Sequence, residues 1–384
     1  MEPLRILQVG SGFPGWGGTE LHLVNLGEQL VLRGHHVTVS ARPDGFVEAE
    51  ARKRGLATAP VTVRRQWDFA DRNALRDLLA RERFDVVHVH WSTDYAVTPL
   101  LARRAGVPAV VMSRHSPYPL KSALGRYLYD RVLFDRVIAL SESVRRTLIA
   151  PKTGNQRAEK VVTIHHGTDT EAFRQTTLST DAVRAEWGIP AGRFVVGLVG
   201  RIAPEKGYAV FLDAVAQAIK AGANVHAVIV GDGPDAAVAK ERAARPDLAG
   251  RVTFGGFRSD VNNAMNALDV FVLASTWAEP CAAVVQQAMA LSKPVIGTDT
   301  GGTPEMVAAG ETGLLVAPGD AVALADALGS LYALPESDRA RMGNAGRTRV
   351  DRLFTLSGMT DRNEALYRDI IGAKAVSKVP PRRP

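Results

Sequence analysis

Two basic residues that follow one apolar run are the first candidates for anion binding. Arg201 and Lys206 come after the run Val195–Gly200. Arginine can bind a phosphate through two parallel hydrogen bonds, and lysine adds a mobile positive charge. Further along, Gly301-Gly302-Thr303 follows another apolar run and leads into a helix, so we expect its backbone N–H groups to be accessible to an anion. A solvated loop could carry the same two cations, but the two loops together predict a clamp for a diphosphate.

A glycine-rich loop near the N-terminus is the second candidate. The stretch Gly10–Gly15 has the spacing of a dinucleotide-binding loop, yet the residues that follow it delay the helix until about Thr19. We therefore expect the N–H groups of Gly17, Gly18 and the helix start to face an anion, with a flexible turn as the alternative. The second apolar run leads to Arg42 without an acid for a ribose, which leaves an NADP-dependent dehydrogenase open.

One acidic residue precedes a helix made of small residues. Glu279 is followed by Pro280, which suits the first helical position, so we expect the carboxylate at a helix N-terminus, facing a ligand. The same helix carries Gln286 and Gln287 among apolar neighbours, and Gln286 is interpreted as an ordinary polar position. Cys281 is the only cysteine, which excludes an internal disulfide and a cysteine-based metal site.

These residues follow apolar runs that alternate with helical patterns, and the series occurs twice. Near-continuous apolar strands between helices are typical of parallel sheets covered on both faces. The first series is Ile6–Gly10, Val37–Ser40, Val86–His90, Ala109–Ser113, Val137–Leu140 and Val161–His165. The second series is Val195–Gly200, His226–Gly231, Val252–Phe254, Val270–Ala274, Pro294–Gly297 and Leu314–Val316. The sequence thus predicts an α/β fold of two doubly wound Rossmann-like domains, in which ligands bind beyond the carboxyl ends of the strands.

Length and turn residues set the predicted domain bounds. The 384 residues exceed what one core usually organises, and hydrophobic residues make up 46% of them. We predict an N-terminal domain over residues 1–175 and a C-terminal domain over residues 190–350. A helix over 356–371 is expected to return to the first domain, and a disordered basic tail is expected over 372–384.

The net charge narrows the range of partners. A formal charge of +7 and a pI near 9.6 favour anionic ligands, of which nucleic acid is the least supported because no RNP-like strand or zinc-finger spacing occurs. Basic and aromatic residues mix over 117–131 and 64–67, which indicates either contact with an anionic membrane surface or an ordinary solvated face. No run is long enough to span a bilayer and none resembles a signal segment, so we expect a cytoplasmic protein.

Six motifs in order resemble those of the family 4 retaining glycosyltransferases, which have the GT-B fold. They lie between Leu4 and about Tyr367 and are Gly17-Gly18-x-Glu20, Gly200-Arg201 with Lys206-Gly207, Gly231-Asp232-Gly233-Pro234, Asp269–Ser275, Glu279 and Gly301-Gly302-x-x-Glu305. The resemblance implies a nucleotide diphosphate sugar as donor, held mainly by the second domain. It also implies an acceptor held by the first domain, with the chemistry in the cleft between them.

The resemblance implies a role for each matching residue. Arg201 and Lys206 would neutralise the donor diphosphate, and Glu279 would hold the transferred sugar. His115, which follows Ala109–Ser113, would contact the reacting sugar, although an isolated histidine is more often a surface or cap residue. Contacts with the donor are further implied for Gly17, Gly18, Gly200, Gln287, Gly301, Gly302 and Thr303.

Three positions depart from the family pattern. Gln287 stands where a glutamate usually binds the ribose, Cys281 and Ala282 replace a glycine and an aromatic residue, and His166-Gly167-Thr168-Asp169 replaces Asn-Gly-x-Asp. A neutral glutamine is expected to weaken donor binding by about 1 kcal/mol, or about fivefold, mainly in KM. The fold and reaction class are unaffected by these changes, whereas the identity of the donor becomes less certain.

Together these features predict a retaining hexosyltransferase that uses a UDP- or GDP-linked donor and a glycan, lipid-linked or small-molecule acceptor. Such a reaction would serve glycan, lipopolysaccharide, exopolysaccharide or glycolipid biosynthesis. No Asp-x-Asp motif occurs, so neither a metal nor another cofactor is expected. We expect front-face transfer in which the leaving diphosphate accepts the acceptor proton, because no carboxylate nucleophile is identifiable. Three alternatives stay open: a sugar-nucleotide epimerase using His115, His165 and Asp169, a non-catalytic sugar-nucleotide-binding protein, and the NADP-dependent dehydrogenase.

Overall fold

A computed structural model describes residues 2–10, 17–61, 69–116, 118, 123–151 and 156–377. The chain forms two compact units: one contains the described residues up to Gly167 and from Leu356 onward, and the other is the continuous segment Thr168–Thr355. The division therefore lies before the predicted bounds of 175 and 190. The segment in between packs on the second unit, where for example Arg184 Nε donates to Ala267 O at 2.8 Å.

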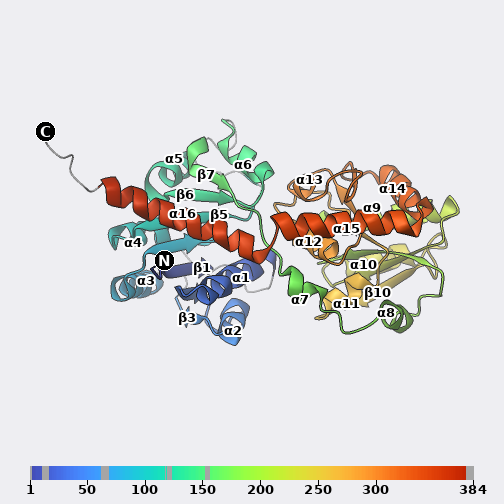
Figure 1. Cartoon of the computed structure of the whole chain (residues 1–384), viewed down its shortest axis with the longest axis horizontal. Helices are drawn as coiled ribbons and strands as arrows, with labels where there is room; N and C mark the ends of the chain where they lie inside the picture. The colour runs from blue at the N-terminus through green and yellow to red at the C-terminus, as the bar shows by residue number, and fades with distance from the viewer. Residues whose placement is uncertain are drawn as a thin grey trace. The chain divides into compact units, whose positions relative to one another are not determined.

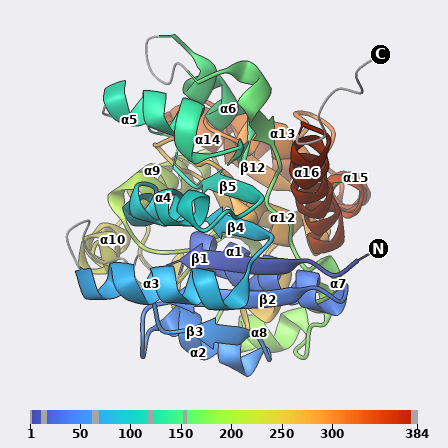
Figure 2. The same ribbon diagram turned by 90° about the vertical axis from the view of Figure 1, so that its left-hand side faces the viewer.

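A seven-stranded parallel sheet organises the first unit, in the order β3-β2-β1-β4-β5-β6-β7. Figure 2 labels the first five strands of this order, from β3 to β5. Its strands are β1 (Arg5–Gly10), β2 (His36–Ala41), β3 (Ala57–Ala59), β4 (Val86–Val89), β5 (Ala109–Arg114), β6 (Arg136–Ala139) and β7 (Val161–Thr163). Six of them coincide with the predicted runs. The sequence does not predict β3, because it has only three residues and pairs with β2 alone at the edge of the sheet.

Helices cover both faces of this sheet (Figure 1). They are α1 (Gly18–Leu32), α2 (Phe46–Lys53), α3 (Phe69–Glu82), α4 (Val97–Arg104), α5 (Ala123–Leu128), α6 (Glu142–Ile149) and α16 (Leu356–Ser377), with short turns η1 (Ser92–Asp94), η2 (Tyr129–Leu133) and η3 (Ala158–Lys160). Leu75 of α3 and Leu101 of α4 pack with Val87 of β4 on one face. Leu23 of α1 packs with Val39 of β2 in a separate cluster. Burial on both faces explains why the strands are almost continuously apolar.

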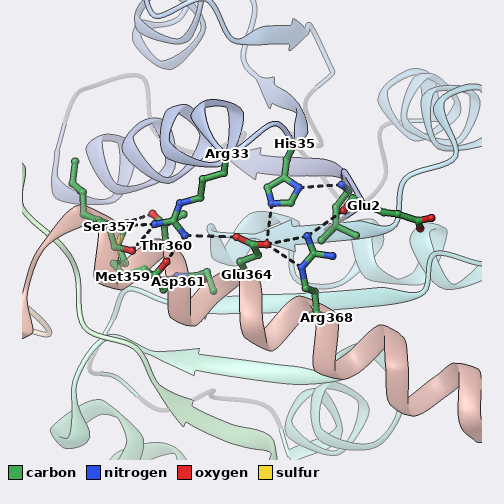
Figure 3. Close-up of polar contacts among 12 residues, drawn as sticks. Glu2, Arg33, His35, Ser357, Met359, Thr360, Asp361, Glu364 and Arg368 are labelled. Carbon is green, nitrogen blue, oxygen red and sulfur yellow. Dashed lines mark hydrogen bonds and ion pairs between the residues drawn. The ribbon is translucent and has the colours of Figure 1, made fainter.

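The last helix completes the first unit through a group of charged side chains (Figure 3). Arg33, which follows α1, pairs with Asp361 at 2.6 Å and with Glu364 at 3.6 Å. Glu364 also lies 3.4 Å from His35 Nε2 and 2.9 Å from Arg368. Burial raises the pKa of Glu364, but the hydrogen bond from Arg368 and the interaction with His35 lower it by more. The carboxylate of Glu364 is thus held ionised between the end of α1 and its own helix.

α16 extends beyond its predicted end. The sequence predicts a helix to residue 371 and a disordered tail from residue 372, but the helix continues to Ser377. Lys374 Nζ donates to Pro108 O at 2.7 Å and lies 2.7 Å from the carboxylate of Asp135, which fixes this turn on the sheet. Residues 378–384 of the predicted tail lie outside the described residues.

The second unit contains a six-stranded parallel sheet in the order β10-β9-β8-β11-β12-β13. Its strands are β8 (Phe194–Val199), β9 (Val225–Val230), β10 (Val252–Gly256), β11 (Val270–Leu273), β12 (Val295–Thr298) and β13 (Gly313–Val316). All six coincide with predicted runs. Two doubly wound Rossmann-like sheets are therefore confirmed.

Helices also cover both faces of the second sheet. They are α7 (Thr170–Arg174), α8 (Thr180–Glu186), α9 (Tyr208–Lys220), α10 (Ala236–Ala243), α11 (Val261–Asn266), α12 (Ala283–Ala290), α13 (Thr303–Met306), α14 (Ala321–Ala333) and α15 (Glu336–Leu353), with the short turn η4 (Pro204–Lys206). Phe211 of α9 and Leu328 of α14 belong to one core cluster, and Met289 of α12 belongs to another. Among the described helices, none is both long and apolar enough to cross a membrane.

His88 connects β4 to α16 inside the first unit. Its Nδ1 lies 2.6 Å from the hydroxyl of Tyr367 and its Nε2 lies 2.8 Å from Ser113 Oγ, and all three side chains are buried. Burial lowers the pKa of His88 to about 3. The unfolded chain therefore binds the proton first, and this residue makes the folded state less stable as the pH falls below about 6.5.

We predict that His88 lowers the free energy of unfolding by about 1 kcal/mol when the pH falls from 7.5 to 5.5. Unfolding of the wild type and of His88→Asn, measured at both pH values, checks this. The variant should be less stable at pH 7.5, because it leaves the hydroxyl of Tyr367 or Ser113 without its partner, but it should lose less stability on acidification. Equal pH dependence in the two proteins would contradict the prediction.

Candidate functional site

The order in which the strands are added to the second sheet changes direction at β8. From β8 the chain continues to β9 on one side, whereas β11 lies on the other side. In such sheets ligands bind at this position, beyond the carboxyl ends of the strands. The loops after β8, β11 and β12 emerge there side by side, and they contain every predicted donor residue of the second unit except Gln287 and Thr303, which lie on α12 and α13.

The loop after β8 is held against the end of β11. Gly207 has φ +68°, and a Cβ atom at this position would lie only 1.9 Å from Ala274 O. The Tyr208 hydroxyl donates to Gly200 O at 2.9 Å, which ties the helix start back to the end of the strand. A glycine at 207 is thus a packing requirement, and it brings the neighbouring Lys206 over the end of β11.

Lys206 and Glu279 form an ion pair between the first two loops. The same Glu279 oxygen accepts a hydrogen bond from Ser275 Oγ at 2.7 Å. The loop after β12 holds the backbone of this residue, since Gly302 N donates to Glu279 O at 2.7 Å. Gly301 has φ +60°, and a Cβ atom on it would lie 2.2 Å from the same carbonyl. Three separate loops therefore meet at Glu279.

The side chain of Arg201 is more exposed to solvent than that of Lys206. Its side chain is 62% exposed and pairs with Glu205. Each cation of the predicted clamp therefore already faces one carboxylate, so the loop is electrically balanced and an incoming diphosphate would exchange with these carboxylates. Sequence reasoning missed Glu205, because a spacing of four residues signals an ion pair only on a helix and residues 201–203 lie in a loop.

The loop after β12 corrects one expectation. The sequence predicts that the backbone N–H groups of Gly301-Gly302-Thr303 are accessible to an anion. Gly302 N is instead bonded to Glu279 O, and Thr303 N donates to Thr300 O at 3.3 Å, while the Thr303 side chain is fully buried. The expectation is wrong for these two N–H groups, because the turn closes on Glu279. Donor binding through them stays a prediction that requires the turn to rearrange.

The start of α12 corrects another expectation. The sequence predicts Pro280 at the first helical position, with Glu279 at the helix N-terminus. The helix begins at Ala283, and its first bond runs from Val285 N to Ala282 O at 2.9 Å. The bond from Gly302 to the Glu279 carbonyl holds this segment outside the helix, so Lys206 and Ser275 orient the carboxylate and the helix terminus does not.

Gln286 is a structural residue and not an ordinary polar neighbour. Its side chain is fully buried, and its Oε1 accepts a hydrogen bond from Thr168 Oγ1 at 2.8 Å. Its Nε2 lies 3.6 Å from Cys281 Sγ. The next residue, Gln287, is half-buried on the same helix. Gln286 therefore joins α12 to Thr168 and to the loop that carries Glu279.

A histidine cluster occupies the corresponding position in the first unit, where β1 and β4 lie side by side. His115 follows β5 and its Nε2 lies 3.2 Å from Nδ1 of His90, which follows β4. The other nitrogen of His90 lies 2.6 Å from Gln8 Oε1. The His22 ring, from α1, lies 5.0 Å from the His115 ring and makes no hydrogen bond with the described residues. His115 is thus part of a group that sequence reasoning missed, although His88 and His90 end one predicted run.

The cluster is neutral near physiological pH. Burial, followed by the neighbouring histidines, lowers the pKa of His115 to about 3, and the pKa values of His22 and His90 are also well below the usual range. A neutral imidazole can donate one hydrogen bond and accept another, which suits a sugar hydroxyl. One nitrogen from each of His22, His90 and His115 lies within 4.8 Å of the others, so these three could also supply metal ligands. The expected absence of a metal stays a prediction.

The start of α1 is already capped by an acidic side chain. Gly17 is the N-cap of α1, and the carboxylate of Glu20, three residues on, accepts hydrogen bonds from the Gly17 backbone and from Trp91. Glu20 is 3% exposed, and burial raises its pKa. Glu20 thus occupies the Gly17 N–H group, which is one of those that the sequence assigns to an anion. The helix begins at Gly18, close to the predicted Thr19, while residues 11–16 of the glycine-rich loop lie outside the described residues.

Asp169 weakens the alternative of an epimerase. It is exposed and its Oδ1 accepts from Ala172 N at 3.0 Å, so it caps α7.

Comparisons with known proteins agree on one family. The model described as "Glycosyl transferases group 1" matches residues 179–349, and that of "Glycosyltransferase Family 4" matches residues 16–172. The lipopolysaccharide core biosynthesis mannosyltransferase LpsB of Rhizobium meliloti is 32% identical over 62% of this chain and 66% of that protein. A GDP-mannose-dependent alpha-mannosyltransferase of Mycobacterium tuberculosis is 30% identical over 83% of this chain and 85% of that protein. The structure of Anabaena HepE with UDP superposes with a TM-score of 0.84, 23% identity and coverage of 95% of this chain and 100% of that chain.

We predict that Gln286→Leu destabilises the second unit by about 1–3 kcal/mol, because it leaves the buried Thr168 hydroxyl without its acceptor. Urea unfolding measures the loss. The matched control is the double variant Thr168→Val/Gln286→Leu, which removes both polar groups and should recover part of the stability. A single variant as stable as the wild type would contradict the proposed role of Gln286.

Proposed function

Because this chain belongs to the family 4 glycosyltransferases and has their GT-B fold, we propose that it transfers a hexose from a UDP- or GDP-linked donor to a hydroxyl acceptor with retention of configuration. The name of the M. tuberculosis relative specifies GDP-mannose, and the Anabaena structure contains UDP. These two proteins support a nucleoside diphosphate sugar without choosing its base.

The meeting of three loops at Glu279 carries this proposal. Lys206 comes from the loop after β8, Ser275 from the loop after β11 and Gly302 from the loop after β12. A cation and a carboxylate fixed together beyond the ends of parallel strands can serve the two halves of a sugar diphosphate. In our proposal the ammonium binds the phosphates, and the carboxylate accepts hydrogen bonds from sugar hydroxyls.

Exchange of ion pairs supplies the charge balance for the reaction. The donor diphosphate replaces Glu279 as the partner of Lys206 and replaces Glu205 as the partner of Arg201. As the bond between the sugar and the diphosphate breaks, negative charge grows on the leaving oxygen, and these two cations stabilise it. The leaving diphosphate oxygen then accepts the proton of the acceptor hydroxyl. Neutral His115 contributes a hydrogen bond to a sugar hydroxyl and no charge.

The acceptor is assigned to the first unit. We propose a hydroxyl group of an envelope glycan or a lipid-linked glycan, since LpsB is named for lipopolysaccharide core biosynthesis. A small-molecule acceptor is a second possibility, and the cytoplasmic location expected from the sequence is part of the same proposal.

Substitution of the two cations tests the proposal. We predict that Lys206→Ala lowers turnover at saturating donor by about 100-fold or more, because it removes a half-buried charge from the leaving group. Arg201→Ala should have a smaller effect, because its exposed side chain is screened by solvent. Release of the nucleoside diphosphate, with candidate donors in the presence of EDTA, measures the rate.

One control variant tests the role of the two cations. Glu205→Gln removes the partner of Arg201 but leaves both cations, so it should keep most of the turnover. Near-wild-type rates in both cation variants would contradict the role of the clamp.

An epimerised nucleotide sugar formed without acceptor would identify an epimerase, and donor binding without any turnover would identify a sensor. The anomeric proton of the product, observed by NMR, decides between retention and inversion.

An exposed apolar face supports the proposed contact with a membrane. Leu124 and Tyr127 of α5 and Val132 of η2 are 68%, 60% and 48% exposed, and Arg131 lies beside them with a half-exposed guanidinium. Its charge is partly balanced, since Arg131 lies 3.2 Å from Asp130. Residues 64–67, 117 and 119–122 of the predicted basic and aromatic segments lie outside the described residues. We infer that this face rests on an anionic bilayer surface.

We predict that the protein sediments with vesicles containing phosphatidylglycerol at low salt and less with neutral vesicles. Leu124→Glu/Tyr127→Glu should abolish sedimentation, because it places two carboxylates at the anionic surface, whereas Leu32→Glu on the exposed side of α1 serves as the matched control. Failure of the wild type to sediment at low salt would remove the proposal.

A further inference from the structure

A second basic pocket lies in the same unit, at the opposite end of the sheet from Lys206 and Glu279. It is an open pocket of about 450 Å³ beside the amino ends of β8, β11 and β12. Arg193 immediately precedes β8, Lys293 lies two residues before β12, and Arg339 comes from the first turns of α15. The six residues of β8 separate this pocket from the Lys206 loop by about 15–20 Å.

Three of the cations in this pocket are bonded only to neutral oxygens. Arg193 Nη1 donates to Asn224 Oδ1, Lys293 Nζ donates to Asn266 O at 2.6 Å, and Arg339 Nη1 donates to Leu331 O at 3.3 Å. The described part of the chain places no carboxylate within ion-pair distance of Arg193, Lys293 or Arg339.

Two acidic residues line the pocket, and Asp269 already has its own partners. Asp269 lines the pocket, but one oxygen pairs with Arg184 at 3.0 Å and the other accepts from Val195 N at 2.7 Å. Glu336 also lines the pocket and is exposed to solvent. Four basic and two acidic side chains line the pocket, so it carries an excess of positive charge.

Two half-buried arginines elsewhere in this unit are neutralised by carboxylates, whereas Arg251 and Arg349 donate to neutral oxygens. Arg242 and Arg258 each pair with two carboxylates, at distances between 2.6 and 2.9 Å. Burial lowers the pKa of Lys293 to about 8, and the charge of Asp269 opposes this shift only in part. A buried ammonium without an anion is costly, and a bound anion would remove this cost.

We propose that this pocket binds a phosphorylated small molecule, with its phosphate on Arg193, Lys293 and Arg339. Two guanidinium groups can each present a pair of donors to phosphate oxygens, and the ammonium adds a third charge. Phe194 and Tyr332 provide an apolar wall for the rest of the ligand, with their ring centroids 5.5 Å apart. Arg339 lies over the Phe194 ring at 5.1 Å, which fixes its guanidinium beside that wall. The site is separate from the donor clamp and does not depend on the proposed transferase activity.

Protection of Lys293 from acylation tests the phosphate site directly. At pH 8 a lysine with this lowered pKa is partly deprotonated and reacts with acetic anhydride, and mass spectrometry of the digest gives its rate. Inorganic phosphate at about ten times its Kd should slow the reaction of Lys293 by about tenfold compared with chloride at equal ionic strength, because only free protein reacts. Exposed Lys220 is the internal control and should react at an unchanged rate.

Variants at Arg193 separate a specific site from general screening. Arg193→Gln should remove most of the protection, whereas Arg193→Lys, which keeps a cation, should retain part of it. Because the readout is Lys293 itself, phosphate bound near Lys206 does not affect the result. Unchanged labelling of Lys293 in phosphate, or equal protection in the Gln variant and the wild type, would overturn the proposal. A sugar phosphate should protect at a lower concentration than inorganic phosphate, and this gain should disappear in Tyr332→Ala; equal concentrations would overturn the apolar wall.

Discussion

The second unit depends on one carboxylate that three loops hold in place. Glu279 pairs with Lys206 and accepts from Ser275, and its backbone carbonyl accepts from Gly302. Two glycines make this convergence possible, because any side chain at 207 or 301 would overlap a neighbouring carbonyl. The parallel strands bring the loops to one edge, but the electrostatic attraction between two side chains far apart in sequence decides how they meet. The side chains that we propose for donor binding are thus arranged in the absence of a ligand.

Balanced charge distinguishes this site from the pocket at the other end of the same strands. At the carboxyl edge Arg201 and Lys206 each face a carboxylate, so the proposed diphosphate would gain binding energy only by exchange with these carboxylates. At the amino edge Arg193, Lys293 and Arg339 are bonded to carbonyl and amide oxygens, so an anion would add a charge partner without displacing one. Exchange makes binding sensitive to the geometry of the ligand, whereas an unbalanced pocket favours any phosphate of suitable size.

The sequence predicts architecture far better than it predicts contacts. All twelve apolar runs are strands, since burial on both faces leaves a clear signal, and among the described strands only the three-residue edge strand β3 is not predicted. Positions of the site loops follow from the same pattern. The pattern does not predict which side chains contact each other. Gln286 contacts Thr168, which is 118 residues away in the sequence, and His90 contacts Gln8, which is 82 residues away. Two predictions are wrong for the same reason, namely the helix start near Pro280 and the free N–H groups at Gly302. In both, contacts with residues distant in the sequence outweigh the local preference.

The first unit is made from both ends of the chain, while the second is one uninterrupted segment. During synthesis the second unit can therefore fold as soon as Thr355 has left the ribosome. Until α16 emerges, the first unit still lacks the hydroxyl of Tyr367 beside His88 and the carboxylate of Glu364 beside Arg33. The unit that is translated first is consequently completed last, and a chain that stops before α16 would have a finished second unit and a first unit whose buried His88 has lost the hydroxyl of Tyr367.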